Sequence, residues 1–103
     1  MKHTIIFNKD SSYQYYNSKE LDDSEWYYNS EFVKNMMMTN ELILKDKGWL
    51  YLREVYDRLG IDSLPISPIL GWDTYQNPKF KYKIIEHRDV NSFEIILNPE
   101  ELK

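Results

Sequence analysis

The sequence predicts one small α+β domain, in which two helices pack on a small antiparallel sheet. Two stretches in the middle of the chain have the apolar spacing of helices, and two stretches near its end alternate apolar and polar residues. The chain has 103 residues, of which 42% are apolar, so it can bury one core and no more. We therefore expect residues 1–103 to form a single domain.

The first helix is predicted over residues 30–47. Ser30 suits the position before the first turn, because its hydroxyl can accept hydrogen bonds from free backbone amides. Apolar residues then recur every three or four positions over about five turns, and Asn40 is the one polar interruption of this stripe. The apolar positions of the stripe are Val33, Met36, Met37, Ile43 and Leu44.

A second, shorter helix is predicted over residues 52–60. Leu52, Val55 and Leu59 fall on one helical face, which is expected to enter the core. Gly48 and Gly60 follow the two helices, and glycine is the usual residue for a left-handed helix end. We expect four aromatic side chains around this unit to be substantially buried: Trp49, Tyr56, Trp72 and Phe93.

The end of the chain predicts a β-hairpin over about 79–87 and 92–98. Apolar and polar residues alternate in "KFKYKIIEH" and "SFEIIL", and "RDVN" supplies a turn between them. Residues 4–7, "TIIF", are a further candidate strand. Prolines in the stretch 61–73 argue against a helix interior or a central strand there. Residues 13–29 show neither period, so a loop with a short helix is expected.

Composition argues against catalysis, bound cofactors and metal. The chain has no cysteine, three glycines and two histidines, so thiolate chemistry, a glycine-rich phosphate loop and a zinc site have little to build on. His87 lies between Glu86 and Asp89, but neighbouring strand residues point to opposite faces and cannot chelate together. We expect a non-enzymatic protein without a cofactor.

The N-terminus favours a cytoplasmic protein. The apolar run in "MKHTIIFNKD" is too short for a signal peptide, and no run approaches the ~20 apolar residues of a membrane span. A cytoplasmic protein that does not enter the membrane is therefore expected.

Charge and tyrosine are concentrated in residues 10–31. The net charge of the chain is −4, and this segment alone carries −5. Its tyrosines could simply cover the first helix, or they could form an interface in which the acids favour a basic partner protein. Both readings fit the composition. The candidate partner-binding residues are Glu20, Asp22, Asp23, Glu25, Tyr15, Tyr16, Tyr27 and Tyr28.

A basic stretch near the C-terminus suggests a rival function. Lys79, Lys81 and Lys83 alternate along the first strand of the hairpin, and Arg88 follows them. Such a row could bind single-stranded nucleic acid, or it could keep the outer face of the sheet soluble. The acidic total charge favours the second reading, so direct nucleic-acid binding is not expected.

Three short stretches form a pattern: the "GWLYL" that begins at Gly48, the "VYDRLGI" that begins at Val55 and the Gly71-Trp72 pair. With the helix before them and the hairpin after them, they resemble small proteins of unassigned function from phages and related mobile elements of low-GC Gram-positive bacteria, over about residues 32–97. The resemblance supplies no catalytic residues and implies a viral or mobile-element origin. Such an origin implies interference with host machinery, and with the acidic segment 10–31 it predicts a small inhibitor of a basic host protein such as a CRISPR effector nuclease. A structural or assembly component of a phage is a third class.

Overall fold

The computed structural model describes residues 1–19, 24–63 and 69–103 as an α+β fold, which confirms the predicted class. The two helices are α1, Ser24–Lys47, and α2, Leu52–Leu59. One sheet has the order β1-β5-β4, with β1 at His3–Phe7, β4 at Tyr82–His87 and β5 at Ser92–Leu97. The other has the order β2-β3-β6, with β2 at Trp49–Tyr51, β3 at Leu70–Asp73 and β6 at Glu100–Glu101. All pairings are antiparallel.

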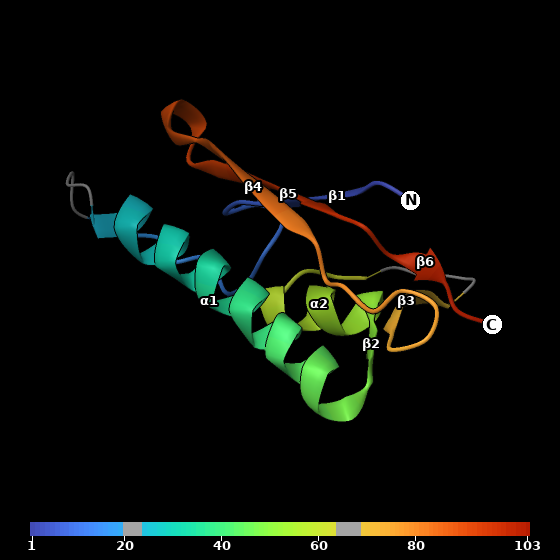
Figure 1. The fold of residues 1–103 in the computed structure, drawn as a ribbon. Coiled ribbons are helices and arrows are strands. Elements are labelled where there is room, and N and C mark those ends of the chain that lie inside the picture. The colour runs from blue at the N-terminus through green and yellow to red at the C-terminus, as the bar shows by residue number, and fades with distance from the viewer. Residues whose placement is uncertain (20–23, 64–68) are drawn as a thin grey trace.

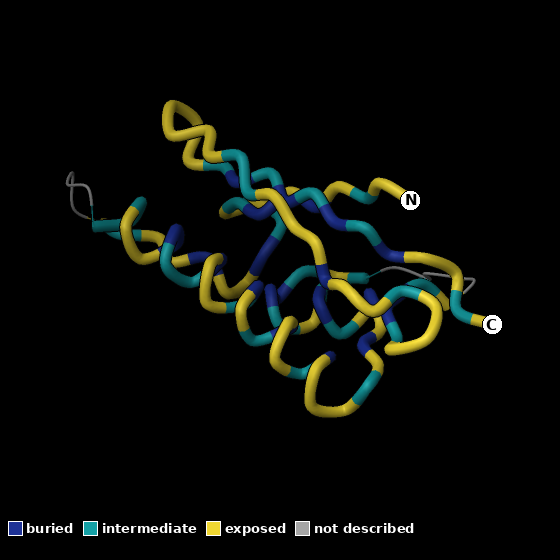
Figure 2. Tube along the Cα trace, in the orientation of Figure 1, coloured by how far each residue is buried: buried dark blue, intermediate teal, exposed yellow. Residues whose placement is uncertain are grey.

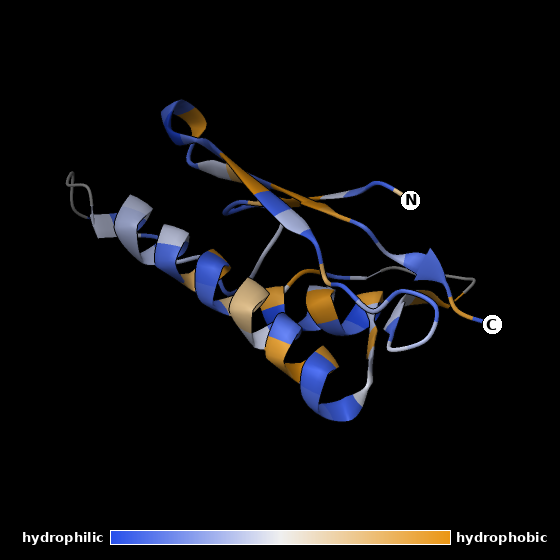
Figure 3. Ribbon diagram, in the orientation of Figure 1, coloured by the Kyte–Doolittle hydropathy of each residue, from blue (hydrophilic) through white to orange (hydrophobic). Residues whose placement is uncertain are grey.

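The core lies between the first sheet and the two helices. The β1-β5-β4 sheet runs above α1, while α2 and the smaller sheet lie beside the C-terminal half of α1 (Figure 1). Buried and less buried residues alternate along β5, and exposed residues gather at the hairpin tip (Figure 2). Hydrophobic residues run along the middle of the hairpin strands (Figure 3). The largest fully buried side chains include Trp72, Phe7, Phe93, Met37, Leu50 and Leu52.

Helix α1 begins six residues before the predicted start at Ser30. Ser30 is therefore not a cap: it lies inside the helix, buried, and its Oγ donates a hydrogen bond to Glu86 Oε1 at 2.8 Å. The earlier turns continue the inward stripe with Trp26 and Asn29. Because Asn29 and Ser30 are both polar and both buried, the apolar periodicity is hidden at this point.

The stretch from Gly48 to Gly60 has the predicted helix ends. Gly48 and Gly60 adopt left-handed φ values of 88° and 71°, and the inward positions of α2 are fully buried. Trp49 contradicts its expected burial, since it is 46% exposed and lies under the ammonium of Lys47 at 5.2 Å from the ring centroid. Strand β2 alternates, so burying Leu50 on one face turns its neighbour Trp49 outward.

Two further expectations about strands are corrected. Leu70–Asp73 forms β3, the central strand of the second sheet, so the expectation of no central strand within 61–73 is wrong for this part of the stretch. The two prolines of that stretch lie outside the described residues. The first hairpin strand begins at Tyr82 rather than at residue 79, and the second ends at Leu97. A 3-10 turn, Arg88–Val90, joins the two strands.

Candidate interaction surfaces

Three exposed tyrosines meet at the N-terminal end of α1 and form the tyrosine cluster, defined as Tyr16, Tyr27 and Tyr28. The ring of Tyr28 lies 5.2 Å from that of Tyr16 and 5.7 Å from that of Tyr27, edge to face in both cases. Their exposed fractions are 47% for Tyr16, 60% for Tyr27 and 54% for Tyr28. Rings in this arrangement attract one another and still present a large contact area to solvent.

The loop that carries Tyr16 is fixed to α1 by a buried asparagine. The Oδ1 of Asn29 accepts from the backbone N–H of Tyr16 at 2.8 Å, and its Nδ2 donates to the Tyr16 carbonyl at 2.8 Å. The same Nδ2 also donates to the Glu25 carbonyl at 2.9 Å. Because Asn29 is fully buried, these bonds exclude water and hold Tyr16 beside the helix. The tyrosine cluster is therefore built from two segments that are held rigidly together.

Glu25 and Tyr15, both predicted to bind a partner, serve the interior of this loop instead. Tyr15 is only 9% exposed and packs on Phe7, with ring centroids 5.7 Å apart, so its assignment to a binding surface is wrong. Its hydroxyl donates to Glu25 Oε2 at 3.1 Å, while Glu25 Oε1 accepts from the Ser18 backbone N–H at 2.8 Å. The three acids Glu20, Asp22 and Asp23 lie outside the described residues.

The environment of Tyr15 keeps its hydroxyl protonated. Burial first, and then the hydrogen bond and negative charge of Glu25, raise the pKa of Tyr15 to about 12. The phenol therefore stays a donor to the Glu25 carboxylate over the whole physiological pH range.

The opposite side of the first turns of α1 is anchored to the hairpin. The indole of Trp26 stacks on Phe93 with ring centroids 4.4 Å apart, and the Arg88 guanidinium lies 5.8 Å from the indole centroid. Farther along the helix, Lys34 approaches Glu86 to 4.0 Å. The helix that carries Tyr27 and Tyr28 is thus packed against the hairpin on its opposite side.

The predicted row of basic residues on one strand does not form. Lys79 and Lys81 precede β4, whereas Lys83 lies within it, and Arg88 is at the hairpin tip over Trp26. The cations are therefore divided between a loop, a strand and a turn, rather than aligned along one face. Sequence alternation alone suggested a longer strand.

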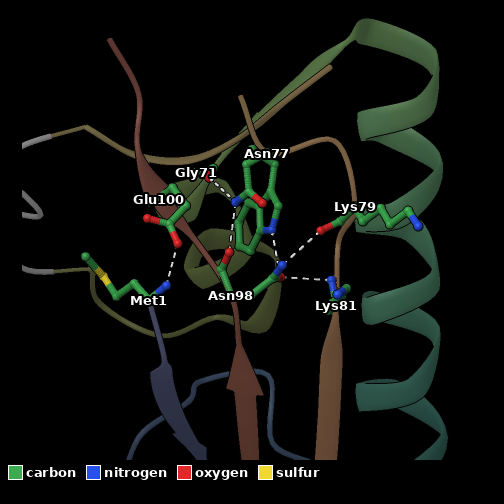
Figure 4. A network of polar contacts seen from close by, with 8 residues as sticks. Met1, Gly71, Asn77, Lys79, Lys81, Asn98 and Glu100 are labelled. Atoms are coloured by element: carbon green, nitrogen blue, oxygen red, sulfur yellow. Dashed lines mark hydrogen bonds and ion pairs between the residues drawn. The ribbon is translucent and has the colours of Figure 1, made fainter. Parts of the chain in front are cut away.

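A network of hydrogen bonds around Asn98, a half-buried side chain, determines the path of the chain before β4 (Figure 4). Asn98 Oδ1 accepts from the Trp72 indole N–H and from the Lys81 backbone N–H, both at 2.9 Å. Asn98 Nδ2 donates to the Lys79 carbonyl at 3.0 Å, and Asn77 Nδ2 donates to the Asn98 carbonyl at 2.8 Å. The loop takes its hydrogen bonds from one side chain instead of from a neighbouring strand, which explains the late start of β4.

The described residues show two further features that bear on function. No three of their His, Cys, Asp or Glu side chains lie close enough together to hold a metal ion. None of their helices is both long enough and apolar enough to cross a membrane.

These features define a small α+β protein with a surface tyrosine cluster and a loop organised by Asn98. Residues 1–95 match a family described as "Family of unknown function (DUF6353)", and the chain belongs to that family. Comparisons with curated proteins and with solved structures gave no significant match.

Proposed function

We propose that this protein is a non-catalytic binding module that engages a partner protein through the tyrosine cluster. The observation that carries the proposal is the contact among Tyr16, Tyr27 and Tyr28, each about half exposed. Tyr27 and Tyr28 lie on a helix whose other side packs on the hairpin, and Asn29 holds Tyr16 beside them. Tyrosine rings supply much of the binding energy at protein interfaces, because they bury a large area at a low cost in side-chain entropy. A rigid platform lowers that cost further.

The charge of the chain supports a partner with a basic surface. Residues 10–31, the segment of the sequence that contains the three tyrosines of the cluster, carry −5 within a chain of net charge −4. Complementary charge speeds the encounter with a cationic surface and discriminates against acidic partners. The narrower form of the proposal is a phage or mobile-element inhibitor that acts in the bacterial cytoplasm on a nucleic-acid-handling nuclease, such as a CRISPR effector. That form rests on this charge and on the resemblance to mobile-element proteins.

The test compares two pairs of exposed tyrosines. The variant Tyr27→Ala/Tyr28→Ala removes most of the cluster, whereas Tyr13→Ala/Tyr75→Ala removes two exposed rings elsewhere, which are 81% and 95% exposed. Binding to a purified CRISPR effector, and inhibition of its DNA cleavage, should weaken by at least about tenfold in the first variant and stay within about twofold in the second. Equal behaviour of the two variants would show that the cluster is not the binding surface.

A separate experiment tests whether the tyrosine cluster binds any partner protein, because a CRISPR effector is only one candidate partner. Proteins retained from a host lysate by the parent and by Tyr13→Ala/Tyr75→Ala should be lost by Tyr27→Ala/Tyr28→Ala. If the captured partner is a nucleic acid, or if the chain instead assembles with itself in sedimentation, the rival classes replace this proposal.

The contribution of the acidic residues to partner binding is tested with charge reversals that avoid the residues that hold the loop in place. Reversing Asp22 and Asp23 to lysine should weaken binding and make it less sensitive to salt. Glu25 is left unchanged, because it holds the loop through Ser18 and Tyr15, and its loss would disturb the cluster for structural reasons.

A further inference from the structure

A second surface, far from the tyrosine cluster, combines an apolar floor with a basic rim. It is a groove of about 450 Å³ between the C-terminal half of α1 and residues 74–81. Leu44 and Phe80 line it and are only 3% and 6% exposed, so they form its floor. At 1.5 Å per residue, Leu44 lies about 24 Å along α1 from Tyr28. The proposed function therefore does not involve this groove.

The rim of the groove carries three lysines: Lys45, Lys79 and Lys81. Lys45 comes from α1 and the other two come from the loop, and the Lys79 side chain extends towards the helix (Figure 4). Within the part of the chain that the structure describes, none of the three forms an ion pair. Glu41 is the one acid in the lining, which leaves a local charge of +2 in a chain of net charge −4.

The groove is held open by the Asn98 network. Asn98 binds the backbone on both sides of Phe80, at Lys79 and Lys81, and is itself fixed by the indole N–H of buried Trp72. The loop is therefore set at the helix without belonging to a sheet. A site whose backbone is already fixed spends little free energy on ordering when it binds.

The basic lining continues beyond the loop. Lys81 and Lys83 flank a smaller hollow of about 220 Å³ that also contains Tyr82 and Ile96. An extended segment leaving the groove would pass along β4, which is an edge strand of the β1-β5-β4 sheet. Peptides commonly bind beside such edges, because the outer backbone groups of the strand are free to pair.

From these features we propose that the groove docks an acidic peptide segment of a partner protein, with one apolar side chain inserted over Leu44 and Phe80 and carboxylates at the lysine rim. A volume of this size fits a few side chains. A nucleic acid is disfavoured, because its continuous phosphate charge would meet Glu41 and a negatively charged molecule. The protein would then possess two independent interfaces at opposite ends of α1.

The experiment uses the full chain and a short synthetic peptide of alternating Glu and Asp around a central Phe. We expect the peptide to shift the NMR amide resonances of Leu44, Thr74 and Lys81 and to leave those of Tyr27 and Tyr28 unchanged. A peptide with Gln and Asn in place of the acids should bind at least about tenfold more weakly. An oligothymidine that binds the groove more tightly than the acidic peptide would overturn the proposal.

Charge-matched variants complete the test. Lys79→Glu/Lys81→Glu should lose peptide binding by at least about tenfold, whereas Lys9→Glu/Arg53→Glu, with the same change in net charge, should keep it within about twofold. If the charge reversal disturbs the fold, peptide binding is measured instead with the milder variant Lys79→Gln/Lys81→Gln, which should also bind the peptide more weakly than the parent. Equal binding by all variants, or self-association through the groove in sedimentation, would contradict an acidic peptide as its occupant.

Discussion

Arg58 on α2 donates a hydrogen bond from Nη1 to Oδ1 of Asn40, a fully buried side chain of α1, at 2.9 Å. The Nδ2 of Asn40 has no hydrogen-bond partner among the described residues. A charged hydrogen bond thus joins the two helices where the apolar stripe of α1 is interrupted. A second one, from Lys47 of α1 to Glu54 of α2 at 3.2 Å, joins them near the end of α1. The polar interruption at Asn40 is therefore one of the contacts between the helices.

A double-mutant cycle on this pair should reveal a coupling of about 1.5–3 kcal/mol, because the donor is charged and the acceptor is buried. The four proteins are the parent, Asn40→Ala, Arg58→Ala and the double variant, each unfolded in urea. Asn35, which is exposed on the same helix, provides the control: Asn35→Ala should change the free energy of unfolding by less than about 0.5 kcal/mol. A coupling near zero would show that the Asn40 bond does not stabilise the fold. Any stabilisation by Arg58 would then come from its ion pair with Glu54, in which Nη2 and Oε1 are 3.4 Å apart.

The stability of the fold should fall as the pH drops below the ordinary range of histidine. Burial lowers the pKa of His3 in the folded state from its ordinary value of 6.5, and its Nε2 lies 2.7 Å from the Tyr56 hydroxyl oxygen. Below 6.5 the unfolded chain takes up a proton that the folded chain does not, so unfolding is favoured until the folded pKa is reached. The melting temperature of the parent should therefore fall more between about pH 7.5 and about pH 5.5 than that of His3→Gln. Parallel curves would contradict this.

Gly71 should not accept a side chain. A Cβ at this position would lie 2.2 Å from the Leu50 carbonyl oxygen and 3.0 Å from the Tyr51 Cα, and both are backbone atoms of the paired strand β2. Gly71→Ala should cost more than about 3 kcal/mol or prevent folding, because the strands would have to separate. Gly48→Ala is the comparison: its Cβ would make only an ordinary contact with Thr74 at 3.8 Å, but its φ is 88°, so a cost of about 1–2 kcal/mol is expected. Thermal melts of the two variants measure the difference.

Asn98→Ala should weaken the core and the groove together. It leaves the indole N–H of Trp72 buried without its acceptor and releases the backbone of Lys79 and Lys81. An unsatisfied buried donor costs about 1–3 kcal/mol, which urea unfolding followed by tryptophan fluorescence will detect. Asn77→Ala removes the bonds to the Gly71 and Asn98 carbonyls but leaves the Trp72 indole N–H with its acceptor, so it should cost less.

The helices and the hairpin were predictable because their apolar residues are regularly spaced. The second sheet and the start of α1 were not predictable, because they depend on contacts between segments that are distant in the sequence. The inward face of α2 and the glycines that follow both helices behave as their sequence indicated. The second sheet was not predicted as a sheet, because β2 has three residues and β6 has two, and strands this short do not indicate their pairing. The start of α1 was missed because buried Asn29 is polar, and its role became visible only once Tyr16 was in place.

The candidate site was predictable in kind but not in detail. Composition marked residues 13–31 as unusual, and three of its tyrosines do meet at the surface. Composition cannot show that Tyr15 turns onto Phe7 or that Glu25 is occupied by its own loop, since both depend on where β1 lies. The Asn98 network was equally hidden, because its partners, from Trp72 to Lys81, lie 17 to 26 residues before Asn98 in the sequence.

The position of β5 between β1 and β4 has a consequence for how the chain folds during synthesis. Strand β1 leaves the ribosome before α1, yet it pairs with β5, which follows α1, both small-sheet strands β2 and β3, and β4 in the sequence. Until β5 emerges, the apolar residues Ile5 and Phe7 have no strand to pair with, whereas α1 can already form from local contacts. The sheet should therefore close late and cooperatively, and nascent chains that stop before residue 92 should be highly sensitive to proteases.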